Sequence, residues 1–186
     1  MEETATTSQV SLFQHAAKWG LIFGAISMAL TAVAYIVDYT ILADWKFGIF
    51  VLIVLLAATI YAGINYRNQI GGFLEYGKAF QHGFILLAIS GIISTLFLIL
   101  MYTVVDTELP TKLTEVSIEN AQKMMENFGM PEDQMDKALE DARKRSEGQF
   151  SAIGSIKSYG FALIFYAIVA LITSIFVRKN QPEEMM

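Results

Sequence analysis

The stretch GFILLAISGIISTLFLILMYTVV, residues 83–105, decides the fold, because it runs for 23 residues without a charged side chain. Three more uncharged apolar runs accompany it, at residues 19–37, 47–66 and 159–177. At about 1.5 Å rise per residue, a helix over any of these runs is about as long as the hydrocarbon core of a bilayer is thick. In lipid the backbone polar groups must bond within their own segment, so the pattern predicts four membrane-spanning helices.

The overall composition agrees with a protein that lies mostly in a membrane. Charged residues make up 17% of the 186 residues, against about 25% in a soluble domain. We therefore expect an all-α integral membrane four-helix bundle forming one domain over residues 1–186, with spans at about 19–37, 47–66, 80–105 and 157–178. Residues 1–12 are polar and lack periodicity, and we expect them to be disordered. The chain has no cysteine, which excludes disulfides and thiolate metal sites.

Residues 107–152 form the only long polar segment, and they read as a helical hairpin outside the membrane. Pro110 suits the first turn of a helix, Gly129 suits a C-terminal cap, and Pro131 restarts a second helix. This second helix either runs on into the fourth span or breaks before it, since Gly148, Gly154 and Gly160 each weaken a helix there. The first helix is amphipathic, and its apolar side chains fall in one sector: Leu113, Ile118, Ala121, Met124, Met125 and Phe128. We expect Met124 and Met125, with Met130 and Met135, to form the core of the hairpin; an adaptable binding surface is the alternative.

This insert is acidic, and its charge limits the classes of partner. Residues 106–150 contain 11 acidic and 6 basic side chains, which equals the net charge of −5 of the whole chain. Nucleic acid is excluded as a partner, because phosphate binding needs a basic surface. The remaining candidates are membrane lipids, another membrane or envelope protein that contacts the acidic lobe, and a second copy of the chain.

The distribution of basic residues favours both termini in the cytoplasm of a bacterial inner membrane. Four spans place both termini on one side, and Arg67, Lys78, Arg178 and Lys179 lie close to the span ends on that side. On the other side most basic residues lie far from the membrane and alternate with carboxylates. Lys157, which precedes the fourth span on that outer side, argues against this orientation.

The spans themselves offer few functional groups. Their Ser and Thr hydroxyls are expected to bond to carbonyls of their own helices; a polar path for a neutral solute is the alternative. Gly20 and Gly24 are four residues apart in the first span and predict close helix packing, within the subunit rather than between copies. His82 reads as a lone interfacial anchor, and His15 lies in the N-terminal segment. We identify no catalytic, cofactor-binding or metal-ligating set.

The junction of the second and third runs reads YRNQIGGFLEYGKAFQHGF, residues 66–84, and adjacent glycines there predict a tight turn that includes Gly77. In this junction and in its four-span layout, the chain resembles a bacterial family of small membrane proteins known as domain of unknown function 4199. The resemblance implies a four-helix membrane architecture and no activity. The residues that carry it are Tyr66, Arg67, Asn68, Gly71, Gly72, Phe73, Gly77, Lys78, Ala79, Phe80 and Gly83.

These observations favour a non-enzymatic membrane protein that uses its acidic lobe for interaction. A small transporter or channel subunit for a neutral or lipophilic solute is the alternative. A membrane enzyme is a more distant reading, and its only candidate groups are Arg67, Glu75 and His82 near one membrane face.

Overall fold

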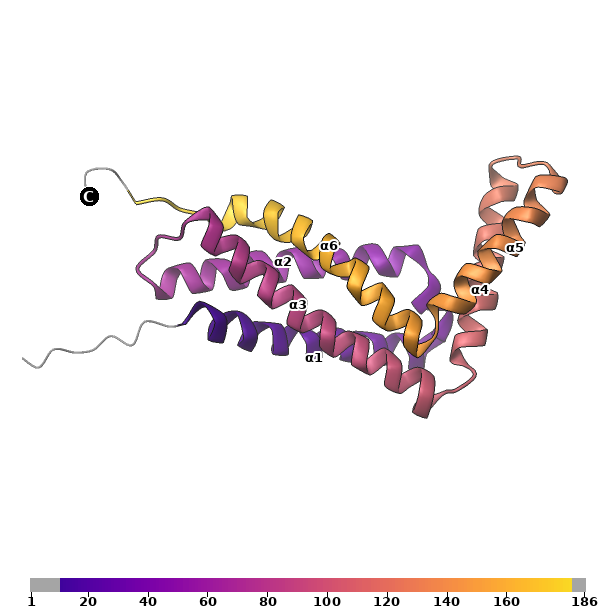
Figure 1. Cartoon of the computed structure of the whole chain (residues 1–186), viewed down its shortest axis with the longest axis horizontal. Helices are drawn as coiled ribbons and strands as arrows, with labels where there is room; N and C mark the ends of the chain where they lie inside the picture. Colours follow the sequence, from indigo (N-terminus) through magenta and orange to yellow (C-terminus); the bar gives the residue numbers. More distant parts are fainter. Residues whose placement is uncertain (1–10, 182–186) are drawn as a thin grey trace, which may run out of the picture.

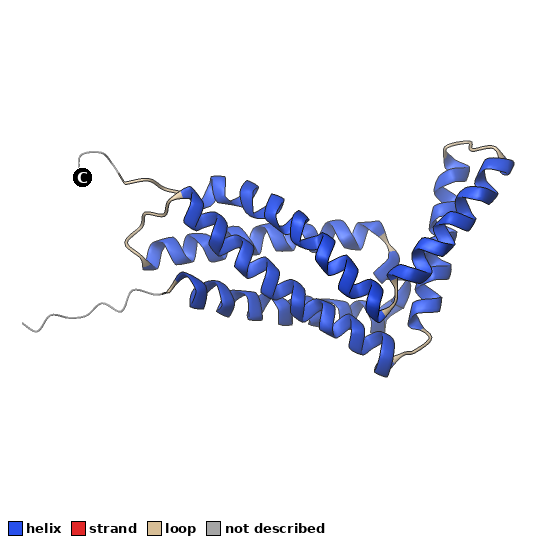
Figure 2. Ribbon diagram, viewed as in Figure 1, coloured by secondary structure: helices blue, strands red, loops and turns tan. Residues whose placement is uncertain are grey.

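The computed structural model describes residues 11–181, and it is helical over almost all of them (Figure 1, Figure 2). The elements are α1 (Leu12–Asp38), the short 3-10 helix η1 (Tyr39–Ala43), α2 (Trp45–Gln69), α3 (Tyr76–Leu100), the π-helical turn η2 (Met101–Val105), α4 (Leu109–Asn127), α5 (Glu132–Gln149) and α6 (Ala152–Val177). Helices α1, α2, α3 and α6 are each long and apolar enough to cross a membrane. The four predicted spans are confirmed.

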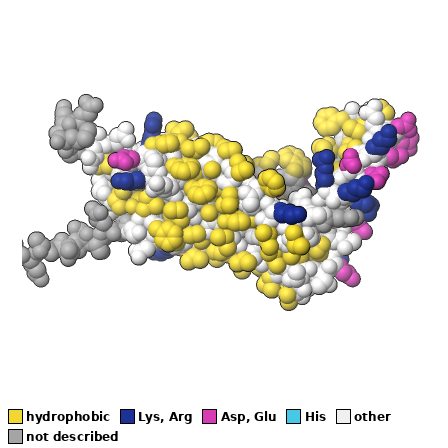
Figure 3. All heavy atoms as spheres, viewed as in Figure 1, with side chains coloured by type: hydrophobic (Ala, Val, Ile, Leu, Met, Phe, Trp, Pro, Cys, Tyr) yellow, Lys and Arg dark blue, Asp and Glu magenta, His cyan; other side chains and the backbone are white. Residues whose placement is uncertain are grey.

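The four long helices form a bundle in which α3 packs against both α1 and α6. Between 17% and 28% of the residues in their most apolar windows are buried inside the bundle. The remaining apolar side chains point outward, as the yellow surface of Figure 3 shows. Phe161 and Phe176, for example, are 75% and 63% exposed. Such a surface is stable only against lipid, so the bundle is built for a bilayer.

The first and third spans start earlier than the apolar runs indicate. Helix α1 begins at Leu12, within the segment expected to be disordered, and residues 1–10 lie outside the described part of the chain. Helix α3 begins at Tyr76. Both helices therefore carry polar turns that extend toward the membrane face, and these turns bring His15 and His82 into the bundle.

Helices α4 and α5 form the predicted hairpin, which projects from the end of the bundle opposite the start of α1 and the end of α6 (Figure 1). Gly129 ends α4 with a φ of 68°, as expected of a glycine cap. The second helix of the hairpin does not continue into the fourth span. It ends at Gln149, and Ser151 caps α6 by accepting a hydrogen bond from the Gly154 amide.

The expected apolar core of the hairpin is only partly correct. Leu113 is buried against the bundle end, packed with Leu109, Met101 and Tyr102. Farther along the same face Ile118, Ala121 and Met125 are half-buried. Met124 and Phe128 are not part of a buried core, because they are 57% and 82% exposed.

Candidate functional site

Two histidines meet inside the bundle, near the end that carries the starts of α1 and α3. The Nδ1 atom of His15 lies 2.8 Å from the Nε2 atom of His82. His82 is fully buried and His15 is 5% exposed. The interpretation of His82 as a lone interfacial anchor is therefore wrong, because the early start of α1 places His15 beside it. Ionisable side chains inside a span are costly, so this pair marks the terminal end as a candidate site.

Trp19 of α1 and two residues of α2, Asn65 and Tyr66, are the remaining partners of the pair. We call the five residues the histidine cluster: His15, Trp19, Asn65, Tyr66 and His82. The Oδ1 atom of Asn65 lies 3.0 Å from the Nε2 atom of His15. The Trp19 indole nitrogen donates to that same His15 nitrogen at 3.2 Å. The Tyr66 ring stacks on His82 with 5.1 Å between ring centroids and 13° between ring planes.

One nitrogen of the cluster has no partner. The Nδ1 atom of His82 is buried and makes no hydrogen bond. The contact between the two imidazoles holds one proton, since one nitrogen must donate and the other accept. Among residues 11–181, no group of three or more side chains of the metal-ligating kind comes together. In the contact between His15 and His82, one histidine is the donor and the other the acceptor.

A pocket of about 350 Å³ opens beside this cluster, between the beginning of α1 and the end of α2. We call it the terminal pocket. His15 and Trp19 link it to the buried pair. Its lining residues are Gln14, His15, Lys18, Trp19, Asn65 and Gln69.

The glycine junction lies at the same end of the bundle. Gly71 and Gly72 have φ values of 98° and 87°, so they form the tight turn that the sequence predicts. Gly77 does not belong to this turn, because it lies in the first turn of α3 with open space around it. Leu74 follows the turn and exchanges backbone hydrogen bonds of 2.8 and 2.9 Å with Lys179.

Arg67 fastens this junction to the end of the fourth span. A guanidinium nitrogen of Arg67 donates to the carbonyl of Val177 at 2.9 Å. From its place at the end of the second span, Arg67 could have reached carbonyls of that span or lipid phosphates; the carbonyl it reaches belongs to α6. The junction thus joins the α2–α3 turn to the end of α6.

The other junction residues have separate surroundings. Asn68 and Lys78 are exposed, and the Lys78 ammonium lies 4.0 Å from the carboxylate of Glu75, which is also exposed. Phe80 stacks on Phe84 within α3. A Cβ atom on Gly83 would lie 3.3 Å from the Cγ2 atom of Thr59, so this glycine permits close packing of α3 on α2. Arg67, Glu75 and His82 are the candidate groups for a membrane enzyme. The structure does not bring these three side chains into contact.

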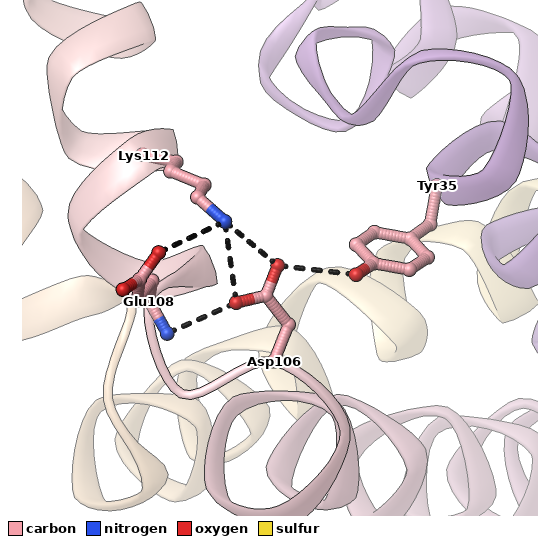
Figure 4. Close-up of polar contacts among 4 residues, drawn as sticks. All are labelled: Tyr35, Asp106, Glu108 and Lys112. Carbon is pink, nitrogen blue, oxygen red and sulfur yellow. Dashed lines mark hydrogen bonds and ion pairs between the residues drawn. The ribbon is translucent and has the colours of Figure 1, made fainter.

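A second polar cluster fixes the base of the hairpin at the opposite end of the bundle (Figure 4). The Asp106 carboxylate accepts hydrogen bonds from the Tyr35 hydroxyl at 3.1 Å and from the Lys112 ammonium at 3.1 Å. It also accepts one from the Glu108 amide at 3.0 Å. Burial raises the pKa of Asp106, but these hydrogen bonds outweigh it and hold the pKa below its ordinary value. The hydrogen bond to Asp106 raises the pKa of Lys112.

Several Ser and Thr hydroxyls inside the spans bond to carbonyls of their own helices, as expected. Thr59, Ser94 and Thr173 donate to carbonyls of their own helices at 2.7, 3.0 and 2.9 Å. A pocket of about 330 Å³ nevertheless lies near the hairpin end of the bundle, and Ser94, Ser158 and Tyr159 are among its lining residues. We call it the hydroxyl pocket.

Sequence reasoning missed the histidine cluster, although a clue was present. His15 precedes the first apolar run, His82 precedes the third, and Asn65 ends the second. Alternating spans place these three positions at the same membrane depth.

No curated protein and no solved structure matches the chain. A sequence model of the family described as "Protein of unknown function (DUF4199)" matches residues 18–179, and the chain therefore belongs to that family of membrane proteins.

Proposed function

We propose that this multi-pass protein is a non-enzymatic component of the bacterial inner membrane that binds a second envelope protein through the tip of its α4–α5 hairpin. Both termini then face the cytoplasm, and the hairpin faces outward. The cations Lys18, Arg67, Lys78, Arg178 and Lys179 support this orientation, because they lie close to the membrane at the terminal end.

The proposal rests on the amino-acid composition of the hairpin tip. Residues 124–136 contain four carboxylates and no lysine or arginine, and Figure 3 shows acidic side chains gathered at the far end of the hairpin. Within this segment Met124 and Phe128 are largely exposed. Methionine and aromatic side chains are enriched at interfaces, and complementary charge around them selects the partner. A basic segment with an apolar anchor fits this surface.

Charge also separates this proposal from self-association through the tip. Two copies that meet there would bring eight carboxylates together, four from each tip, and like charges across an interface are unfavourable. The base of the hairpin meanwhile packs Leu109 and Leu113 into the bundle end, and Lys112 pairs with Asp106. The tip is therefore presented in a fixed direction, as a docking surface requires.

The test is site-specific photo-crosslinking in intact cells, with a crosslinkable residue at Phe128 and a control at the lipid-facing Ile53 of α2. We expect a crosslink from position 128 to a basic segment of another envelope protein. Charge reversal by E126K with D133K should abolish it, whereas E115K on the body of α4 should leave it intact. A crosslink only to a second copy, or one that is unaffected by charge reversal, would contradict the proposal.

The hydroxyl pocket supports one alternative function, the passage of a neutral or lipophilic solute. It is lined by hydroxyl groups and aromatic rings and contains no charged side chain. Flux of uncharged solutes into vesicles that contain the purified protein tests this alternative. A saturable flux that is lost on filling the pocket by S94F would favour transport over docking.

A further inference from the structure

The terminal pocket is lined entirely by side chains that can donate hydrogen bonds. Lys18 contributes an ammonium group and Trp19 an indole N–H, which can only donate. Three amides and one imidazole complete the lining, from Gln14, Asn65, Gln69 and His15. No carboxylate of residues 11–181 takes part in this lining. A pocket that offers donors and a positive charge suits a ligand with anionic oxygens.

The surroundings of the pocket are also positively charged. Arg67, Lys78, Arg178 and Lys179 lie at the same end of the bundle, and Glu75 is the one carboxylate near them in the part of the chain that the structure describes. Lys18 forms no ion pair with any carboxylate of residues 11–181. Its ammonium group is thus available to a ligand.

The hydrogen bonds at the floor of the pocket allow two tautomers of His15, and one of them frees a donor for a ligand. The Nε2 atom of His15 faces the Asn65 oxygen at 3.0 Å and the Trp19 N–H at 3.2 Å. One imidazole nitrogen cannot donate to the first and accept from the second at the same time. Gln69 donates to the same Asn65 oxygen at 2.7 Å, which fixes that oxygen as an acceptor. The indole N–H of Trp19 bonds to His15 in the tautomer whose Nε2 atom is an acceptor. In the other tautomer Nε2 donates to Asn65, and the indole N–H can then donate to a ligand oxygen.

We propose that the terminal pocket binds the phosphate of an anionic lipid headgroup, with Lys18 as its charged anchor and the Trp19 indole as a neutral donor. The position of the pocket supports a lipid source, because tryptophan and lysine near the end of a span lie at headgroup depth. Its volume of about 350 Å³ is within the range of small-molecule sites. The site lies at the opposite end of the bundle from the hairpin tip and does not depend on the docking proposal.

The chain provides its own reporter for this site. It contains two tryptophans, and Trp45, which is 70% exposed, begins α2 at the opposite end of the bundle. In the full-length W45F variant, Trp19 alone reports on the pocket. We would place this variant in phosphatidylcholine nanodiscs with increasing fractions of phosphatidylglycerol and record the indole emission. Parallel titrations in pure phosphatidylcholine would use glycerol 3-phosphate and inorganic phosphate.

We expect a saturable emission change with phosphatidylglycerol that K18Q weakens by roughly tenfold, the loss of one charge-assisted contact. K18R should retain binding, and K46Q, which removes an exposed lysine at the other end, should not affect it. A response to the soluble phosphates alone would keep the anion site and overturn the lipid source. Absence of any response, or a response to phosphatidylglycerol that K18Q leaves unchanged, would overturn the proposal.

Discussion

The imidazoles of His15 and His82 are hydrogen-bonded at 2.8 Å although 67 residues separate them in the chain. This contact joins the first and third spans where both are buried. If a substitution removes either imidazole, the facing nitrogen of the other histidine is left without a hydrogen-bond partner in an apolar environment. Leaving a buried polar group unsatisfied generally costs more than the net value of the hydrogen bond itself.

A double-mutant cycle measures this contact. We expect H15A and H82A each to lower the free energy of unfolding by about 1–3 kcal/mol. The double variant should cost less than the sum, because the second substitution removes the nitrogen that the first one orphaned. Equilibrium unfolding in mixed micelles gives these values. H82F, which keeps a ring beside Tyr66, separates loss of stacking from loss of the hydrogen bond. Additive effects would show that the two imidazoles do not interact.

The packing of α1 on α3 predicts a strong effect at Gly24. A Cβ atom at this position would lie 2.6 Å from the Cδ1 atom of Ile93 and 2.8 Å from its Cβ atom. We therefore expect G24A to destabilise the bundle by about 1–3 kcal/mol, as overpacking does. Gly160 of α6 has open space around it, so G160A is the matched control and should stabilise by up to about 1 kcal/mol. Thermal unfolding in detergent compares them, and equal effects would refute the close contact.

The turn between α2 and α3 predicts a backbone effect without any steric clash. Gly72 has a φ of 87° and nothing within 4 Å of its Cβ position. We expect G72A to cost about 1–2 kcal/mol, since an L-residue is strained in this conformation. G77A changes a helical glycine that also lies in open space, and it should be neutral or stabilising. Unfolding of the two variants side by side tests the conformation of the turn.

The low pKa of Asp106 predicts a pH dependence at the base of the hairpin. Because the folded state depresses this pKa below the ordinary 3.8, the ionised carboxylate stabilises the base at pH values above 3.8. That contribution is lost as the pH falls through the depressed value. Spin labels at Lys46 and Lys137 report the hairpin position as a distance distribution. We expect this distribution to broaden progressively as the pH falls below 3.8 through the depressed pKa of Asp106, and in D106N at every pH.

Glu108 offers the control for this experiment. Its side chain is 80% exposed and lies 3.4 Å from the Lys112 ammonium, and such exposed pairs contribute little. E108Q should therefore leave the distance distribution unchanged. A broadening in E108Q equal to that in D106N would show that Asp106 has no special part in holding the hairpin.

The absence of cysteine makes the proposed orientation simple to test. Single cysteines would replace Asn127 near the hairpin tip and Lys78 at the terminal end, both of which are exposed. We expect a maleimide that cannot cross the inner membrane to label position 127, and not position 78, in intact cells. Labelling of position 78 alone would reverse the orientation and place the hairpin in the cytoplasm.

The spans and the hairpin could be predicted because each follows from local sequence. An uncharged run of 19 to 23 residues has few stable structures other than a membrane helix, and glycine with proline between amphipathic segments predicts a hairpin. The break between α5 and α6 could not be placed from the sequence, for a local reason as well. Ser151 can cap a helix, but a cap is hard to recognise where helical periodicity continues on both sides.

The histidine cluster could not be read from local patterns. Its members come from three helices, and each appears in the sequence as an isolated polar residue at the end of an apolar run. Arg67 shows the same limit, because the carbonyl that it reaches belongs to a residue 110 positions later. Comparing the membrane depth of polar residues across alternating spans would place the members of the cluster at one depth. It would not show which of them touch, because packing sets the register between helices.

The backbone pairing of Leu74 with Lys179 has a consequence for how the protein is made. These residues are 105 positions apart, so a ribosome that adds about 5–20 residues per second completes Lys179 roughly 5–20 seconds after Leu74. During that interval the three spans made first are in place while the α2–α3 turn waits for its partners. Synthesis must reach the end of α6 before the carbonyl of Val177 that Arg67 binds is supplied as well. A chain that stops before residue 177 therefore leaves both Arg67 and the backbone of Leu74 without these partners.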